Sequence, residues 1–296
     1  MQIKTINTIS CCNNYFSKST LHPLACLIDL SDIKYCDLLQ LDFYSVWLKE
    51  CTNCLGFGRK EYDFFEGTLS FLSPNQPINL KLWHGCEEVK SYLLCFHPSL
   101  IKHTPFEEHF SNYTFFHYRQ NEALHISARE KKIIENCMNG ISEELEWGID
   151  EYSKTLLAGK IELLLNYCMR FYKRQFITRH EINKSILEKT NQLLENYFLT
   201  NKVINKGLPT IEYFSRMLGL SPAYFEDLLK HETGKNANEF ILFKRIEFVC
   251  KELQRTEKTP ADIAKEQGFP SVQYFCKLFK RVTGYSPNEY RALEIQ

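Results

Sequence analysis

Two stretches near the end of the chain decide its fold: LGLSPAYFEDLLKHETGK at residues 218–235 and QGFPSVQYFCKLFKRVTGY at residues 267–285. Aligned with each other, they share aromatic, apolar, basic and turn positions at an offset of 50 residues. The matched positions are Tyr224-Phe225 with Tyr274-Phe275, Leu228 with Leu278, Lys230 with Lys280, and Thr233-Gly234 with Thr283-Gly284. A segment that recurs in this way predicts two copies of one supersecondary unit.

Each copy is predicted to fold as a helix, a tight turn and a second helix. Gly219 and Gly268 stand where each turn needs a left-handed residue. Ser221 and Ser271 stand where the next helix needs a side-chain cap. In a helix-turn-helix unit the second helix lies in the major groove of DNA. The helices expected in this part are Ser185–Phe198, Pro209–Leu218, Pro222–Glu232, Ala237–Gln254, Pro260–Glu266, Ser271–Val282 and Pro287–Leu293.

The second helix of the second copy separates into two faces. The apolar residues at helical spacing are expected in the core: Phe275, Leu278, Phe279 and Val282. The opposite face carries Gln273, Cys276, Lys277 and Lys280. Glutamine bonds adenine through two hydrogen bonds, and lysine reaches guanine or a phosphate. A helical bundle with a merely solvated charged face would explain one such copy, but two copies in register favour DNA binding.

The run IAKEQGFPSVQYFCKLFKRVTGYSPNEYR at residues 263–291 resembles the signature of the AraC/XylS family of bacterial transcription regulators. The resemblance rests on Ile263-Ala264, Gly268-Phe269, Tyr274-Phe275, Phe279-Lys280, Gly284, Ser286-Pro287 and Tyr290-Arg291. The helix between the two copies also fits, with Arg245-Ile246 in place, and departs at Val249, where the family usually has alanine. The resemblance covers residues 185–293 and implies a sequence-specific DNA-binding transcription regulator that responds to a small-molecule effector.

The resemblance also implies which side chains meet DNA. In the first copy these are Ala223, Glu226 and Asp227, with Lys230 as a further contact. In the second copy they are Val272, Gln273 and Lys277, with Tyr274 beside them and with Lys280 and Arg281 on phosphates. Two neighbouring acids repel phosphates, so we expect the second copy to supply more of the affinity.

The first half of the chain is predicted to be rich in β-structure. Short aromatic and apolar segments at 41–48, 67–72 and 92–96 alternate with turn residues, as in an antiparallel barrel or sandwich. Ser127 and Glu130 form the capping box of a helix, and a second helix is expected near 150–175. The predicted class is therefore α+β. The resemblance to full-length members of the family implies a cupin-like sensor domain at 1–125, a helical dimerisation segment at 126–178, a linker at 179–184, and an all-α DNA-binding domain at 185–296.

Composition excludes several classes of protein. The 296 residues hold 36 Lys+Arg and 36 Asp+Glu, with 44% hydrophobic residues, which is ordinary globular composition. From Gly268 to Tyr285 there are three basic residues and no acid, and such a local stripe suits a polyanionic partner. No stretch approaches 18 consecutive apolar residues and no secretory signal is visible, so a cytoplasmic protein without a membrane partner is expected.

Twelve cysteines are too dilute for a disulfide scaffold, and most are expected to be small buried hydrophobic residues. Cys51-Thr-Asn-Cys54 has the spacing of a redox or metal pair, so a redox- or metal-responsive regulator is an alternative. Because no partner motif follows, we expect no metal and no cofactor. An enzymatic or sugar-binding barrel is the remaining alternative, but no catalytic signature is present and no enzyme is expected.

Three partners besides double-stranded DNA are expected: an effector, a second copy of the chain and RNA polymerase. The effector would enter a cavity lined by aromatic residues, namely Phe43, Tyr44, Trp47, Phe64, Phe65, Phe71 and Trp83. An equal alternative is that these rings fill the barrel solidly. The second copy would pack on residues 127–176 through an apolar face with Leu157, Leu164, Leu165 and Phe171. The alternative is that this face covers the barrel.

Overall fold

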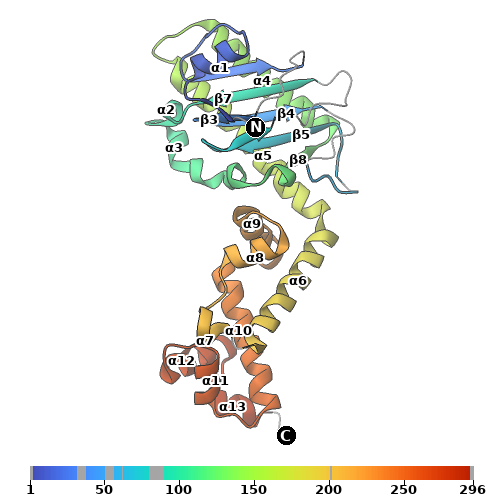
Figure 1. Cartoon of the computed structure of the whole chain (residues 1–296), viewed down its shortest axis with the longest axis vertical. Coiled ribbons are helices and arrows are strands. Elements are labelled where there is room, and N and C mark those ends of the chain that lie inside the picture. Colours follow the sequence, from blue (N-terminus) through green and yellow to red (C-terminus); the bar gives the residue numbers. More distant parts are fainter. Residues whose placement is uncertain are drawn as a thin grey trace. The chain divides into compact units, whose positions relative to one another are not determined.

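The computed structural model describes residues 3–31, 38–50, 57–61, 63–79, 90–200 and 202–293. The chain divides into two compact units, residues 1–179 and residues 180–296 (Figure 1). The first unit contains the strands and two long helices, and the second unit is entirely helical where it is described. The α+β class expected from the sequence is confirmed.

The strands of the first unit form two sheets. One is antiparallel, in the order β2 (Ala25–Asp29), β7 (Ser91–Phe96), β4 (Tyr44–Lys49), β5 (Gly67–Leu72) and β8 (Leu124–Ile126). The other has the order β1 (Ile3–Ile6), β3 (Leu38–Leu41) and β6 (Pro77–Asn79), with β1 and β3 parallel. The segments predicted at 67–72 and 92–96 are strands, whereas the segment at 41–48 is divided between β3 and β4.

A single hydrophobic core lies between these sheets. It contains Ile28 and Leu93 from the larger sheet, Leu39 from the smaller one, and Ile9 and Cys12 from helix α1 (Ile9–Tyr15). Residues opposite one another in neighbouring strands share a face. The larger sheet therefore directs one set of side chains toward α1 and the smaller sheet, and the alternate set toward the helices behind it.

Three of the seven aromatic residues predicted to line a cavity are buried in the interior of the unit, and Tyr44 and Phe64 are half-buried. Phe43 and Trp47 are buried in the core between the sheets, and Phe71 packs against Phe115 with ring centroids 4.3 Å apart. Phe65 is exposed, and Trp83 lies outside the described residues. Trp47 packs edge-to-face on Phe57, so packing among buried rings accounts for these residues without a cavity.

Two antiparallel helices cover the outer face of the larger sheet: α4 (Ala128–Trp147) and α5 (Ser153–Thr178) (Figure 1). The capping box of Ser127 and Glu130 is confirmed. The chain reaches α4 through β8 and five short helices or turns: α2 (Pro98–Ile101), α3 (Pro105–His109), η2 (Phe110–Asn112), η3 (Thr114–His117) and η4 (Gln120–Glu122).

The apolar face of α5 that was expected to bind a second copy is buried within the unit. Leu157, Leu164, Leu165 and Phe171 are all at most 5% exposed. This face covers the sheet and α4, so its apolar character is explained without a partner. These four side chains are therefore not a dimer interface.

The second unit consists of α6 (His180–Leu199), α7 (Lys202–Lys206), α8 (Ile211–Leu218), α9 (Pro222–Thr233), α10 (Ala237–Arg255), α11 (Pro260–Glu266), α12 (Val272–Thr283) and α13 (Pro287–Ala292). The segment expected as a linker, 179–184, contains Arg179 and the first turn of α6. One core joins α6, α8, α9 and one end of α10, and another joins the other end of α10 to α11, α12 and α13. Each helix in the described part is too short or too polar to cross a lipid bilayer.

Candidate nucleic-acid interface

The second helix-turn-helix unit is formed by α11 and α12. Gly268 turns the chain at φ +66°, and the hydroxyl of Ser271 accepts a hydrogen bond from the Tyr274 amide at 3.1 Å, which starts α12 as predicted. Phe275, Leu278 and Phe279 are buried, but Val282 is 40% exposed. The expected core position of Val282 is wrong, because the core made with α10, α11 and α13 does not include the last turn of α12.

The opposite face of α12 is open. Every predicted DNA contact of this copy is exposed: Val272, Gln273, Tyr274, Lys277, Lys280 and Arg281. In the part of the chain that the structure describes, neither Lys277 nor Arg281 forms a salt bridge. Their charges are therefore available to an external anion.

The first helix-turn-helix unit, α8 and α9, has the same local geometry. Gly219 is left-handed at φ +71°, and the Ser221 hydroxyl accepts from the Tyr224 amide at 3.2 Å. Helix α8 begins at Ile211 rather than at Pro209, because the side chain of Thr210 caps it. The surface differs from that of α12, since Ala223, Glu226 and Asp227 are half-buried and only Lys230 is exposed.

Glu226 has a partner inside the unit. Its carboxylate accepts a hydrogen bond at 3.0 Å from the backbone amide of Ala237, the first residue of α10. Asn236 and Glu239 complete a capping box at the same helix end. An anion at a helix N-terminus satisfies an unpaired amide and complements the helix dipole. Glu226 therefore links α9 to the N-terminus of α10, a role that the alignment with the second copy did not predict.

The turn of the second unit rests on a buried arginine of the connecting helix. The guanidinium of Arg245 stacks 3.5 Å from the ring centroid of Phe269 and donates to the carbonyl of Gln267. Burial lowers the pKa of Arg245 to about 10, so the side chain is charged at neutral pH. Arg245 thus positions the turn that precedes α12, consistent with its place in the motif.

A second support of this turn comes from α7, which sequence periodicity did not reveal. A Cβ atom placed on Gly268 would lie 2.7 Å from Cγ1 of Val203, which is itself buried. At Gly219, the equivalent position in the first copy, no atom of the described residues lies within 4 Å of such a Cβ. A short helix such as α7 carries too few residues to show an apolar period.

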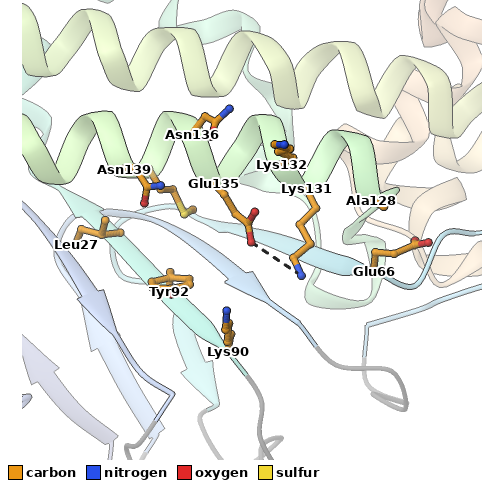
Figure 2. Close-up of a pocket in the computed structure, with 11 residues that line it drawn as sticks. Leu27, Glu66, Lys90, Tyr92, Ala128, Lys131, Lys132, Glu135, Asn136 and Asn139 are labelled. Carbon is orange, nitrogen blue, oxygen red and sulfur yellow. Dashed lines mark ion pairs between the residues drawn. The ribbon is translucent and has the colours of Figure 1, made fainter.

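The first unit contains a pocket of about 520 Å³ between the larger sheet and α4 (Figure 2). Its lining is polar and mixed in charge: Leu27, Glu66, Lys90, Tyr92, Ala128, Lys131, Lys132, Glu135, Asn136, Met138 and Asn139. The Lys131 ammonium lies 2.7 Å from Glu50, so one of the lysines is already neutralised. None of the aromatic residues predicted to line a cavity lines this pocket, and Cys51 and Cys54 lie outside the described residues.

Two helix-turn-helix units carried by one helical scaffold define a DNA-binding transcription regulator. A family model described as a helix-turn-helix domain matches residues 214–293. Regulatory protein SoxS of Salmonella typhimurium is 30% identical over 81 residues, which are 27% of this chain and 76% of that protein. The chain belongs to the AraC/XylS family of transcription regulators.

The likeness extends beyond the DNA-binding unit in at least one relative. An HTH-type transcriptional regulator of Haemophilus influenzae is 24% identical over 266 residues, covering 84% of this chain and 85% of that protein. Other regulators match along only 21% or 26% of their own length. The solved C-terminal domain of AraT, a response regulator of Geobacillus stearothermophilus, is 28% identical, with a TM-score of 0.30, over 36% of this chain and 84% of that domain.

Proposed function

We propose that α12 reads bases in the DNA site, while α9 contributes mainly shape and phosphate contacts. The observation that carries this proposal is the difference between the two surfaces. The exposed face of α12 presents Lys277, Lys280 and Arg281 and no acid. On α9, the position that matches Lys277 is occupied by Asp227. Glu226, whose carboxylate caps α10, is assigned a structural role instead of a base contact.

Gln273 and Lys277 are one turn apart on α12 and fit adenine and guanine edges. Lys280 and Arg281 lie in the last turn of the helix and are assigned to phosphates. Helix α10 has 19 residues, and at about 1.5 Å per residue it is about 28 Å long. Neighbouring major-groove segments on one face of DNA are about 34 Å apart. One chain would therefore place its two units on DNA segments about 10 base pairs apart, with α12 reading the bases of its own segment.

The test compares two alanine variants on a panel of single-base variants of one DNA site. Lys277→Ala should cost about 1–3 kcal/mol, chiefly on one cognate base. Arg281→Ala should weaken all sites alike and flatten the salt dependence by about one unit. Lys173→Ala, which removes an exposed lysine of α5, is the control for a lost charge. A uniform loss across the panel for Lys277→Ala would show that this lysine only holds a phosphate.

The first unit is proposed to bind the effector in the pocket beside α4. The exposed ammonium groups of Lys90 and Lys132 and the amides of Asn136 and Asn139 favour a small polar molecule with an acidic group. A native mass spectrum of the full chain should show such a molecule, and Asn139→Trp, which fills the pocket, should lose it. A bare wild-type mass, together with a melting temperature unchanged by a panel of organic acids, would contradict the proposal.

A homodimer through the helical region is also proposed, on residues other than those first expected. Trp147 at the end of α4, Ile149 and Tyr152 in the following turn, and Leu156 on α5 are exposed apolar residues. Removal of such side chains from water is a main driving force of association. The Trp147→Ser variant should shift the mass in solution toward the monomer. Contact with RNA polymerase remains a prediction of the family resemblance.

A further inference from the structure

We propose that Cys12, Cys26 and Cys95 form a three-thiolate site for a trivalent thiophilic metalloid, with arsenite as the probe. The site goes beyond the proposed effector pocket. Leu27 and Tyr92 line that pocket, whereas Cys26 and Cys95 belong to the core on the opposite face of the same sheet. Neither the site nor its test depends on DNA binding.

Three separate elements bring the sulfur atoms together. Cys26 on β2 and Cys95 on β7 are direct cross-strand partners, and Cys12 comes from α1, which packs on this face. The three Sγ atoms all lie within 4.8 Å of one another. The cysteines are 0%, 5% and 0% exposed in chain order, so the sulfur atoms face each other inside an apolar core.

The spacing fits one central atom. Bonds of about 2.3 Å from a central ion to sulfur place the sulfur atoms about 4 Å apart in a planar trigonal site, and closer together in the pyramidal geometry of arsenic(III). A closed structural zinc site requires four ligands. Among the described residues no histidine or carboxylate joins the three sulfur atoms, and the Ser45 hydroxyl lies 3.9 Å from Cys95 Sγ. Three-coordinate chemistry is therefore favoured over zinc.

Charge balance selects the oxidation state. A buried net charge without a partner is costly in an apolar core. Three thiolates around a monovalent or divalent ion leave a net negative charge, but around arsenic(III) the sum is zero. Arsenous acid, As(OH)3, reacts with three thiols to give As(SR)3 and three waters. Three S–H and three As–O bonds break, three As–S and three O–H bonds form, and nothing is oxidised or reduced.

The proposed site joins two elements of the first unit through soft sulfur ligands, which suit a thiophilic ion. Since Cys12 is the only one of the three on α1, a bound ion would fasten this seven-residue helix to the larger sheet.

The experiment uses the reduced full-length chain, titrated with arsenite and examined by native mass spectrometry. A three-thiolate adduct adds one arsenic and loses three hydrogens, whereas a two-thiolate adduct retains a hydroxyl group. Cys12→Ala, Cys26→Ala and Cys95→Ala should each bind at least tenfold more weakly and lose the three-thiolate mass. The control variants Cys51→Ala/Cys54→Ala and Cys137→Ala should keep it.

Because a core variant can fail to fold, the wild-type chain provides a second measurement. Arsenite should protect Cys12, Cys26 and Cys95 from alkylation after rapid denaturation, as mapped on peptides. Protection of these three cysteines and retention of the adduct in the controls support the site. Absence of a three-thiolate adduct, protection of other cysteines in their place, or an adduct that survives Cys12→Ala would overturn it.

Discussion

Replacement of Gly268 by alanine tests how the second recognition helix is held. The residue has φ +66°, and an added Cβ would lie 2.7 Å from Cγ1 of Val203. Val203 is buried in the core that α7 shares with α6 and α10, so its side chain has no free space into which to move. Gly219, the equivalent residue of the first copy, has φ +71°, and within the described part of the chain no atom lies within 4 Å of the added Cβ.

Comparison of alanine variants at the two glycines distinguishes the cost of a left-handed backbone from the cost of a side-chain clash. An alanine in the left-handed region costs about 1–2 kcal/mol. That cost applies to both sites, so we expect Gly219→Ala to lower the free energy of unfolding by this amount. At Gly268 the clash with Val203 adds overpacking, which typically costs about 1–3 kcal/mol more. In a Val203→Ala background the cost of Gly268→Ala should fall back to that of Gly219→Ala.

Chemical denaturation can resolve the two units without separating them. The three tryptophans are residues 47, 83 and 147, so tryptophan fluorescence follows the first unit alone. Far-ultraviolet circular dichroism also follows the helices of the second unit. Both glycine variants should shift the dichroism transition and leave the fluorescence transition unchanged. The role assigned to α7 would be refuted if both glycine variants lost the same free energy of unfolding, or if Val203→Ala did not reduce the loss caused by Gly268→Ala.

Two further predictions concern stability. Burial lowers the pKa of His125, which lies beside the ion pair of Asp63 and Arg179, to about 4. The free energy of unfolding of the first unit should therefore fall by up to about 3 kcal/mol as pH falls from 6.5 to 4, and should not change through this group above pH 6.5. In urea unfolding followed by fluorescence, His125→Gln should make this free energy depend less on pH, and an equal pH dependence in both proteins would contradict the prediction. Glu226→Ala should destabilise the second unit by about 1 kcal/mol, and Glu226→Gln should destabilise it less. Neither variant should change the base preference in DNA binding. A changed preference for one base without loss of stability would show that Glu226 contacts DNA instead.

The sequence predicted the second unit more closely than the first. Its helices are bounded by caps and by left-handed glycines, which act within a few residues, so the predicted starts at Pro222, Ala237 and Pro260 agree with the structure. Helix α6 begins five residues before the expected Ser185, since no cap or glycine marks its start.

The first unit depends on contacts that span longer stretches of sequence. The buried partners Asp63 and Arg179 are 116 residues apart, and Cys12 on α1 lies beside Cys95 on β7. Periodicity showed that α5 has a wide apolar face, but not whether this face covers the sheet or a second chain. Aromatic content likewise could not distinguish a cavity from a packed core, because both require apolar residues on the same strands.

At the candidate DNA surface, the sequence repeat predicts the backbone of the two copies but not the side chains that each copy exposes. Equal backbone geometry in the two copies follows from matched glycines and serines, and both turns are confirmed. The surfaces have diverged at matched positions, since Asp227 stands in the place of Lys277, and Glu226, in the place of Cys276, binds the start of α10. Under the proposed mode of reading, repulsion between Asp227 and the phosphates lowers the contribution of α9 to affinity on every sequence, because the phosphate backbone carries no sequence information. Discrimination between bases then rests on α12, whose exposed face carries no acid.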